Sequence, residues 1–273
     1  MPPVRYPITL ASATFVLLHL AALAVCFVPC RPALVGMALA LYALRMFGVT
    51  AGYHRYFSHR AFRLARPAQC LLAILAQSAG QKGVLWWAAH HRDHHRHSDQ
   101  AGDIHSPVTG SFFWSHVGWV LSDRYECTDL DKVKDLARFP ELRWLERFHW
   151  LPSLALALLV AVWGASSGVG LGASLAWFAL STVAVYHATF TINSLAHVWG
   201  TRRFETQDRS RNNALLALLT FGEGWHNNHH RHPGSCRQGL RWWELDLTQG
   251  ALRILAWVNI VTDIKSHSSG VQS

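Results

Sequence analysis

Two long stretches without a charged residue separate apolar from polar parts of the chain. Residues 8–29 form a charge-free run of 22 residues, and a second apolar run covers residues 33–50. A helix of 22 residues is about 33 Å long, which matches a hydrocarbon layer of about 30 Å. Pro29, Cys30, Arg31 and Pro32 predict a tight turn between the runs. A signal peptide would have a shorter apolar region, so the pattern predicts a hairpin of membrane helices.

The second charge-free stretch runs from residue 148 to residue 201 and is long enough for two further membrane helices. Glycines at positions 164, 168, 170 and 172 indicate a turn in its middle. We therefore expect helices over residues 151–167 and 173–196. The GVGLG sequence at this turn does not predict a dinucleotide site, because it lacks a preceding strand and a following polar helix.

Residues 67–87 are apolar but are interrupted by glutamines, a serine and a lysine. This composition predicts an interfacial or protein-packed helix rather than a span. The pattern thus predicts an all-α integral membrane protein, a single domain over residues 1–273. Four transmembrane helices form two hairpins, and residues 51–150 and 198–273 form a polar helical cap.

Composition agrees with a membrane protein and gives its orientation. Only 15% of residues are charged, against about 25% in soluble domains, which argues against a soluble globule. Thirteen Lys or Arg residues lie in 51–150 and nine lie in 198–273, while the two hairpin turns hold only Arg31. Positive segments stay in the cytoplasm, so we expect the cap and both termini there. The net charge of +9 therefore reflects orientation rather than nucleic-acid binding.

Histidines are the second unusual feature, and many of the 18 lie in three clusters. Two clusters have members at i, i+3 and i+4, which fall on one helix face within about 100°. The other pair is at i, i+5, about 140° apart on an α-helix, so it would hold a centre from a helix end. His197, four residues after Asn193, is a ninth candidate. The clusters are His54 with His59, His91 with His94 and His95, and His226 with His229 and His230.

An even number of crossings separates the first two clusters from the third, so all of them can meet on one side of the membrane. Nine imidazoles exceed the ligands of one metal ion, which indicates two ions. Imidazole binds Zn, Cu, Fe and Ni, so ligand type alone does not choose the metal. The alternative is that these are surface histidine tracts without a shared centre. The five cysteines form no CxxC pair, so a thiolate-held cluster is not expected.

The motifs HRYFSH, HRDHH and HNNHH, with the contexts TAGYHRYFSH, SFFWSHVGW, NSLAHVWG and FGEGWHNNHH, resemble those of the membrane fatty acyl desaturases. The chain is most similar to the bacterial delta-9 acyl-CoA (stearoyl-CoA type) branch. The resemblance implies a di-iron centre that activates O₂ and uses two external electrons to make a cis double bond. In a purified protein, zinc can replace the iron. The implied metal ligands are His54, His59, His91, His94, His95, His197, His226, His229, His230 and, through a water molecule, Asn193.

Metal-bound imidazoles need acceptors for their second nitrogen. Candidates are Asp93, Asp103, Asp208 and Glu223. By resemblance, Ala38 and Tyr42 fall at the far end of a substrate tunnel, where a bulky Tyr42 would limit chain length. Many acyl-CoA members carry an acidic residue directly before the second cluster, whereas this chain has Ala89 and His90. Acyl-CoA is the expected substrate, with a phospholipid or carrier-protein ester as the alternative.

Electrons are expected from a separate acidic ferredoxin- or rubredoxin-like protein and its reductase, because the sequence shows no haem domain, flavin fingerprint or cysteine cluster. A hydroxylase or alkane monooxygenase with a similar centre is the alternative function within the same chemistry. A metal transporter would need histidines across the membrane, and a metalloprotease would usually show HExxH, which this chain lacks. The expected location is a bacterial inner membrane.

Overall fold

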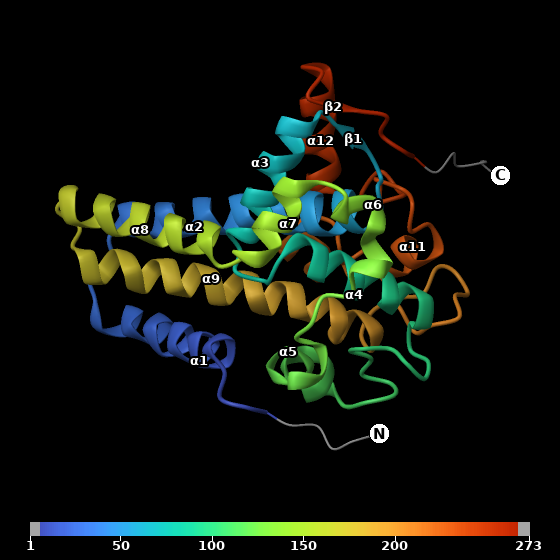
Figure 1. Ribbon diagram of the computed structural model, residues 1–273, viewed down its shortest axis with the longest axis horizontal. Coiled ribbons are helices and arrows are strands. Elements are labelled where there is room, and N and C mark those ends of the chain that lie inside the picture. Colours follow the sequence, from blue (N-terminus) through green and yellow to red (C-terminus); the bar gives the residue numbers. More distant parts are fainter. Residues whose placement is uncertain (1–5, 267–273) are drawn as a thin grey trace.

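The computed structural model describes residues 6–266 and consists mostly of helices (Figure 1). Four long apolar helices lie side by side, close to the predicted positions. They are α1 (Leu10–Leu23), α2 (Pro32–Phe47), α8 (Leu151–Ser166) and α9 (Leu171–Asn193). Helix α9 is central, because it contacts α1 on one side and α2 and α8 on the other (Figure 1). The two helices of the first predicted hairpin therefore both pack on α9.

Within residues 6–266, two helical stretches are long and apolar enough to cross a membrane, namely Pro32–Ser58 and Leu171–His197. A third is obtained if α8 and the preceding α7 (Pro140–Arg147), bent by 67° relative to each other, form one span. Helix α1 continues into the short 3₁₀ helix η1 (Ala24–Phe27), but the apolar helix Ala11–Phe27 is shorter than a span. That all four helices cross the membrane remains a prediction.

The candidate span Pro32–Ser58 differs from the prediction at its C-terminal end. Helix α2 does not end at residue 50 but continues without a break into a π-helix, η2 (Gly48–Ser58). Within α2, Arg45 is fully buried and donates hydrogen bonds to Thr182 and Ser181 of α9, each at 2.6 Å. Hydroxyl groups on α9 therefore satisfy this guanidinium inside the bundle.

The remaining helices form the cap that covers one end of the bundle (Figure 1). Helix α3 (Arg66–Gln77) buries Gln69 and Ala73 and exposes Leu71, as an interfacial helix does, and α4 (Val84–His97) follows it. The other cap helices are η3 (Trp114–Gly118), α5 (Trp119–Leu121), η4 (Asp123–Tyr125), η5 (Leu130–Val133), α6 (Lys134–Ala137), η6 (Leu195–His197), α10 (Ala214–Leu219), α11 (His226–Arg231) and α12 (Leu247–Trp257).

A small antiparallel sheet departs from the all-α prediction. Strand β1 (Arg63–Leu64) pairs with β2 (Val261–Thr262), with Arg63 opposite Thr262. The pairing ties the last described segment of the chain to the loop that follows η2. Each strand has only two residues, too few for an alternating pattern to be recognised in the sequence.

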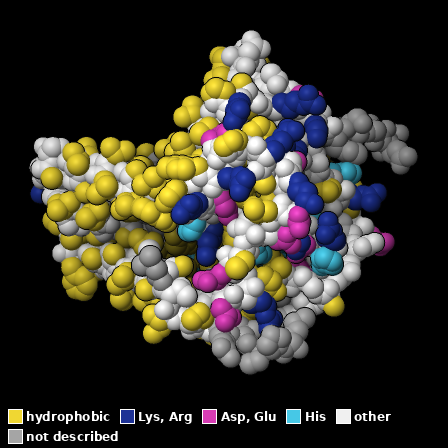
Figure 2. Space-filling model, in the orientation of Figure 1, with side chains coloured by type: hydrophobic (Ala, Val, Ile, Leu, Met, Phe, Trp, Pro, Cys, Tyr) yellow, Lys and Arg dark blue, Asp and Glu magenta, His cyan; other side chains and the backbone are white. Residues whose placement is uncertain are grey.

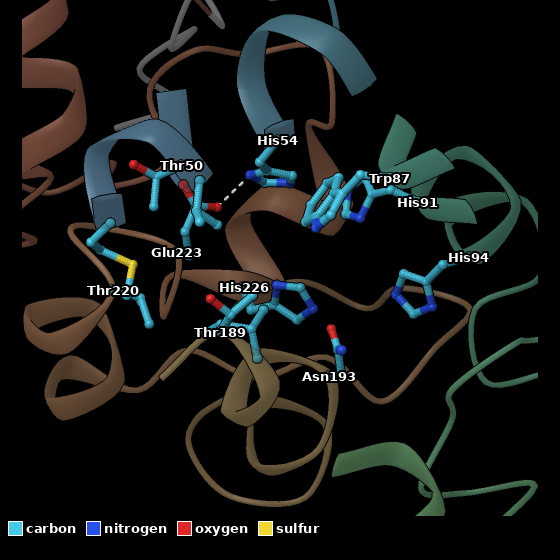
Figure 3. Close-up of a pocket in the computed structure, with 13 residues that line it drawn as sticks. Thr50, His54, Trp87, His91, His94, Thr189, Asn193, Thr220, Glu223 and His226 are labelled. Carbon is cyan, nitrogen blue, oxygen red and sulfur yellow. Dashed lines mark ion pairs between the residues drawn. The ribbon is translucent and has the colours of Figure 1, made fainter. Parts of the chain in front are cut away.

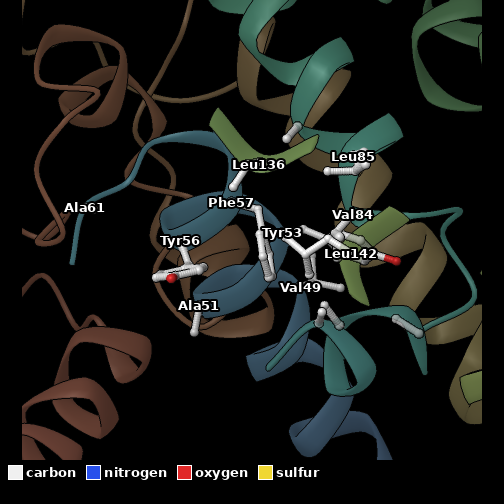
Figure 4. Close-up of a cluster of buried hydrophobic side chains, with 14 of the residues drawn as sticks. Val49, Ala51, Tyr53, Tyr56, Phe57, Ala61, Val84, Leu85, Leu136 and Leu142 are labelled. Atoms are coloured by element: carbon white, nitrogen blue, oxygen red, sulfur yellow. The ribbon is translucent and has the colours of Figure 1, made fainter. Parts of the chain in front are cut away.

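The main hydrophobic core lies around η2 (Figure 4). Tyr53, Tyr56 and Phe57 of η2 are buried against residues of α4 and α7, among them Leu85 and Leu142. The Tyr53 hydroxyl donates to the Lys82 carbonyl at 2.6 Å, which satisfies the polar end of this buried ring. The core therefore packs against one side of the π-helix, and the histidine side of this helix faces the other cap segments.

Candidate metal centre

The structure brings all nine predicted histidines together in two groups. We call them the first and the second histidine group, and in each the imidazole nitrogens that face a common centre lie within 4.8 Å of one another. The first group consists of His54, His59, His91, His95 and His229, and the second of His94, His197, His226 and His230. The π-helix η2, α4, η6 and α11 contribute these side chains. The centre thus joins segments that lie far apart in the sequence.

The spacing of the nitrogens fits a metal ion in each group. In the first group, the Nε2 atoms of His54 and His229 are 3.0 Å apart, and those of His59 and His91 are 2.8 Å apart. In the second, the Nε2 atoms of His197 and His226 are 3.1 Å apart. Metal–nitrogen bonds of about 2.1 Å place neighbouring ligand nitrogens about 3.0–3.4 Å apart. In addition, the buried Nε2 of His230 has no hydrogen-bond partner, as a free ligand atom would.

The helices α4 and α11 each serve both groups. On α4, His91 and His95 face the first group, whereas His94 faces the second; on α11, His226 and His230 face the second group and His229 the first. Residues four apart stay together because they lie about one α-helical turn apart. Although its members fall within one broad helix face, neither cluster points toward a single locus. Instead, the two helices lie so that both contribute to both metal positions.

The π-helix explains the spacing of His54 and His59. The His59 amide donates to the His54 carbonyl at 3.2 Å, an i→i+5 hydrogen bond that defines π-helical geometry. A residue five positions along therefore lies about one turn above, and the two rings have centroids only 4.8 Å apart. The predicted separation of about 140° assumed an α-helix and is wrong for this segment.

Carboxylates accept hydrogen bonds from the outer nitrogens of four of the nine histidines. Asp103 contacts His94 at 2.9 Å, and Asp208 contacts His230 at 2.6 Å. Glu223 lies 2.5 Å from Nδ1 of His54 (Figure 3). Such contacts orient the ring and select its tautomer.

The sequence did not predict the fourth carboxylate, and one carboxylate that it did predict does not contact a histidine of the centre. Asp99 contacts Nδ1 of His197 at 2.8 Å. By contrast, Asp93 pairs with Lys132 at 2.5 Å and with Arg96 at 3.9 Å. Both aspartates lie close to the second cluster in the sequence. Asp93 occupies an outer face of α4, whereas Asp99 follows the helix end, where the loop turns back toward the centre.

Burial keeps most of these imidazoles neutral, as metal binding requires. It lowers the pKa of His59, His91, His95, His226 and His229 well below the usual value, and the neighbouring imidazoles add to this effect. Burial also lowers the pKa of His230 to about 4, although Asp208 opposes the shift. Burial alone would raise the pKa of Asp208, but the His230 imidazole outweighs it and holds that pKa well below its usual range.

A cavity of about 30 Å³ lies between the centre and the C-terminal ends of α2 and α9. It is lined by histidines from both groups, by Asn193 and Thr189 of α9, and by Met46 of α2 (Figure 3). This volume is enough for about one water molecule. Asn193 therefore borders the same space as His94 and His226, where a water molecule can lie between the amide and a metal ion.

The two predicted tunnel residues do not line this cavity. The Tyr42 hydroxyl donates to the Leu219 carbonyl of α10 at 2.6 Å, and Ala38 is buried, with its carbonyl accepting from Ser181. Both lie on α2, one and two turns before Met46, which does line the cavity. A tunnel that continues from the cavity along α2 would reach Tyr42 first.

Three of the nine histidines outside both groups form a hydrogen-bonded series. His19 of α1 contacts His187 of α9, and His187 contacts His116 of η3, each at 3.0 Å. Each ring uses its two nitrogens for different neighbours, so the series does not converge on a common centre. The contact between His19 and His187 therefore ties α1 to α9.

Comparisons with known proteins match most of the chain. The family model described as fatty acid desaturase matches residues 31–255. The sn-1 stearoyl-lipid 9-desaturase of Anabaena variabilis is 37% identical over 257 residues, 92% of this chain and 91% of that protein. The Acyl-CoA 5-desaturase of Anemone leveillei is 36% identical over 85% of this chain and 72% of its own length.

A chloroplastic palmitoyl-monogalactosyldiacylglycerol delta-7 desaturase of Arabidopsis thaliana is 37% identical over 86% of this chain. The match spans 62% of that protein. These relatives share the word desaturase in their names but differ in the acyl carrier and in the position of the double bond.

Proposed function

This chain belongs to the fatty acid desaturase family, and from that membership we propose that it is an oxygen-dependent desaturase that introduces a cis double bond at position 9 of a saturated acyl chain. The observation that carries the proposal is the pair of histidine groups at the end of an apolar helix bundle. Family membership supports an oxidoreductase, while the position of the double bond and the acyl carrier belong to the proposal.

The chemistry of the substrate explains why such a centre is needed. A methylene pair in mid-chain has no acidic proton and no adjacent carbonyl, so acid–base catalysis cannot act on it. Two iron ions, when bound, supply the activation of O₂ and the removal of two hydrogens. The nine histidines, with Asn193 through water, would hold them. Zinc in the same positions would be inactive, because it has no redox chemistry.

The residues of the chain contribute orientation and exclusion of water. Asp99, Asp103, Asp208 and Glu223 fix the tautomers of four ligand imidazoles. The apolar side chains of Met46, Val49 and Ile192 line the membrane side of the cavity. An acyl chain that enters along α2 and α9 would meet these side chains next to the centre.

Acyl-CoA remains the first proposed carrier, and a glycerolipid-linked chain is the second candidate. Two observations favour the second candidate. The relative from Anabaena variabilis, most of whose length is matched, is named for a stearoyl-lipid substrate. In addition, Ala89 and His90 stand where many acyl-CoA members have an acidic residue.

The electron donor is proposed to be a separate acidic carrier of the ferredoxin or rubredoxin type. Lys and Arg side chains gather on the cap, whereas the surface of the long helices is hydrophobic (Figure 2). A basic face attracts an acidic partner at long range. The cap and both termini are proposed to face the cytoplasm at a bacterial inner membrane.

Expression in a strain that requires unsaturated fatty acids tests the function. We expect growth without supplement and a delta-9 cis olefin in the lipids, mapped by gas chromatography and mass spectrometry. Addition of saturated acyl-CoA or saturated glycerolipid to membranes then identifies the carrier. An alcohol product would instead support the hydroxylase alternative.

A matched pair of variants on α4 tests the centre. His95→Ala removes an imidazole of the first group and should abolish product formation. His97→Ala, two residues along, removes an imidazole that belongs to neither group and hydrogen-bonds to the Asp93 carbonyl, and it should leave product formation intact. Full activity of His95→Ala, at equal protein level, would contradict the proposed centre.

A further inference from the structure

The two histidine groups differ in the carboxylates that support them. Three of the four imidazoles in the second group contact a carboxylate: His94 contacts Asp103, His197 contacts Asp99 and His230 contacts Asp208. In the first group only His54 does so, through Glu223. Within residues 6–266, no carboxylate contacts the outer nitrogens of His59, His91, His95 or His229, and Nδ1 of His229 has no hydrogen-bond partner.

The charges of these carboxylates are also balanced differently. Glu223 forms an ion pair with Arg55, whose guanidinium donates to it at 3.0 Å and 3.2 Å. Asp99, Asp103 and Asp208 accept only from imidazoles, backbone amides and hydroxyl groups. Examples are Ser106 with Asp99 at 2.5 Å and Ser210 with Asp208 at 2.5 Å. In the part of the chain that the structure describes, no Lys or Arg forms a salt bridge with these three carboxylates.

All three carboxylates are shielded from solvent. The side chains of Asp99, Asp103 and Asp208 have 3%, 0% and 9% of their surface exposed. Charges in such surroundings interact more strongly than charges in water, because the local dielectric constant is lower. The second group therefore lies among three carboxylates that form no salt bridge with a described Lys or Arg, while the single carboxylate beside the first group pairs with an arginine.

From this asymmetry we infer that the two metal positions are unequal, and that the second histidine group binds the first metal ion and holds it more tightly. A carboxylate behind a ligand imidazole raises the basicity of that ligand, and loss of such a partner typically costs about 10–100-fold in metal affinity. Three carboxylates support imidazoles of the second histidine group, and one carboxylate supports an imidazole of the first. The first group has five imidazoles, but an added neutral ligand supplies no opposing charge. The inference rests on the proposed function, from which it takes the two metal ions.

Titration of the metal-free full chain in detergent with Co²⁺, followed by equilibrium dialysis and metal analysis, tests the inference. We expect two binding steps, the first at least about 10-fold tighter than the second. Asp208→Asn keeps the size of the side chain and removes its charge. It should weaken the first step about 10–100-fold and leave the second unchanged, while Glu223→Gln should weaken only the second step. A single step with equal affinities, or weakening of the second step by Asp208→Asn, would overturn the inference.

Asp93→Asn is the matched control, because Asp93 lies between ligand residues of α4 but pairs with Lys132 instead of an imidazole. Asp93→Asn should change the affinity of neither Co²⁺ binding step. The elution volume and the circular dichroism of each metal-free variant establish that it is folded.

A measurement on the unmodified protein covers the case in which the aspartate variants do not fold. Bound Co²⁺ shifts the proton resonances of its imidazole ligands, and Nδ1 protons held by carboxylates exchange slowly with water. At one equivalent of Co²⁺ we expect three such protons, from His94, His197 and His230. A single slowly exchanging proton at one equivalent would place the first ion in the first group and refute the inference.

Failure of the inference and failure of the proposed function give different results. A protein that binds Co²⁺ in two unequal steps but forms no double bond with iron disproves the desaturase proposal and leaves the inference standing. A protein that forms the double bond but binds both ions equally disproves only the inference.

Discussion

The buried guanidinium of Arg55 joins the chain segments that carry the first and third histidine clusters. It donates to Glu223, to Asp246 and to the Cys236 carbonyl, and 1% of its side chain is exposed. Glu223 in turn contacts His54. A single side chain thus sets the distance between η2 and the segment that leads into α11.

We expect Arg55→Leu to destabilise the protein by about 3–5 kcal/mol, because two carboxylates are left buried without their cation. Thermal unfolding in detergent measures the loss. The control is Arg66→Leu, which breaks an exposed pair with Glu141 and should cost far less, since solvent screens that pair. Equal losses of unfolding free energy in the two variants would show that the buried Arg55 network stabilises the protein no more than an exposed ion pair does.

Tyr42 gives a second prediction at the scale of a residue. It lies on the α2 face that leads to Met46 and the cavity, and its ring packs against Phe221 with centroids 6.3 Å apart. Tyr42→Ala should shift the products toward longer acyl chains, because the ring limits the depth of the proposed tunnel. Gas chromatography of the lipids provides the measurement. Leu39→Ala, on the exposed side of the same helix, should not change the profile, and an unchanged profile for Tyr42→Ala would rule out the idea.

Among the elements, α4 depends on α7 for its position. The Glu146 carboxylate of α7 accepts hydrogen bonds from the backbone amides of Leu85 and Trp86 at the start of α4, and from the Thr128 hydroxyl. Gly83 lies so close to this carboxylate that a methyl group there would displace it. Because α4 carries three of the nine histidines, a shift of its first turn would move both metal positions.

Glu146→Ala should therefore weaken folding by about 1–3 kcal/mol, since the amides of α4 lose their buried acceptor. It should also lower the metal content of the purified protein. Glu146→Gln retains one acceptor oxygen, so it should keep part of the stability and part of the metal content that Glu146→Ala loses. Metal analysis together with thermal unfolding checks the prediction, and an unaltered metal content in the alanine variant would contradict it.

The sequence predicted the long apolar helices well and the local geometry of the centre less well. A charge-free apolar run favours a long helix, so the predicted ranges 151–167 and 173–196 closely match α8 and α9. Asp99 was not recognised because its role depends on how η6, which carries His197, packs against the loop that follows α4. The burial of Arg45 depends on hydroxyl groups of a helix more than 130 residues away.

At the scale of the whole molecule, hydrophobic and charged surfaces are separated (Figure 2). The long helices expose apolar side chains such as Leu17, Leu158 and Val162, as contact with lipid requires. The cap carries most of the basic residues. This division supports a protein whose substrate comes from the membrane and whose electrons come from the aqueous side.

We expect high salt to slow turnover with the native electron donor more than turnover with a small chemical reductant. At an ionic strength of about 0.1 M the screening length is about 10 Å, and it shortens as salt is added. Docking of an acidic protein on the basic cap depends on these long-range interactions. Measurement of product formation at several salt concentrations with both reductants decides the point. Equal sensitivity would argue against docking by charge.

The π-helix η2 has a consequence for how histidine motifs are compared. In an α-helix, a residue four positions along returns to the same face, whereas in a π-helix the residue five positions along does so. His91 and His95 on α4 bring two imidazoles to the first group with a spacing of four residues, and His54 on η2 with His59 directly after η2 does the same with a spacing of five. Deletion of one residue between His54 and His59 would preserve their alignment if the segment reverted to α-helical hydrogen bonding. The spacing of a histidine pair thus reports the hydrogen-bond register of its helix.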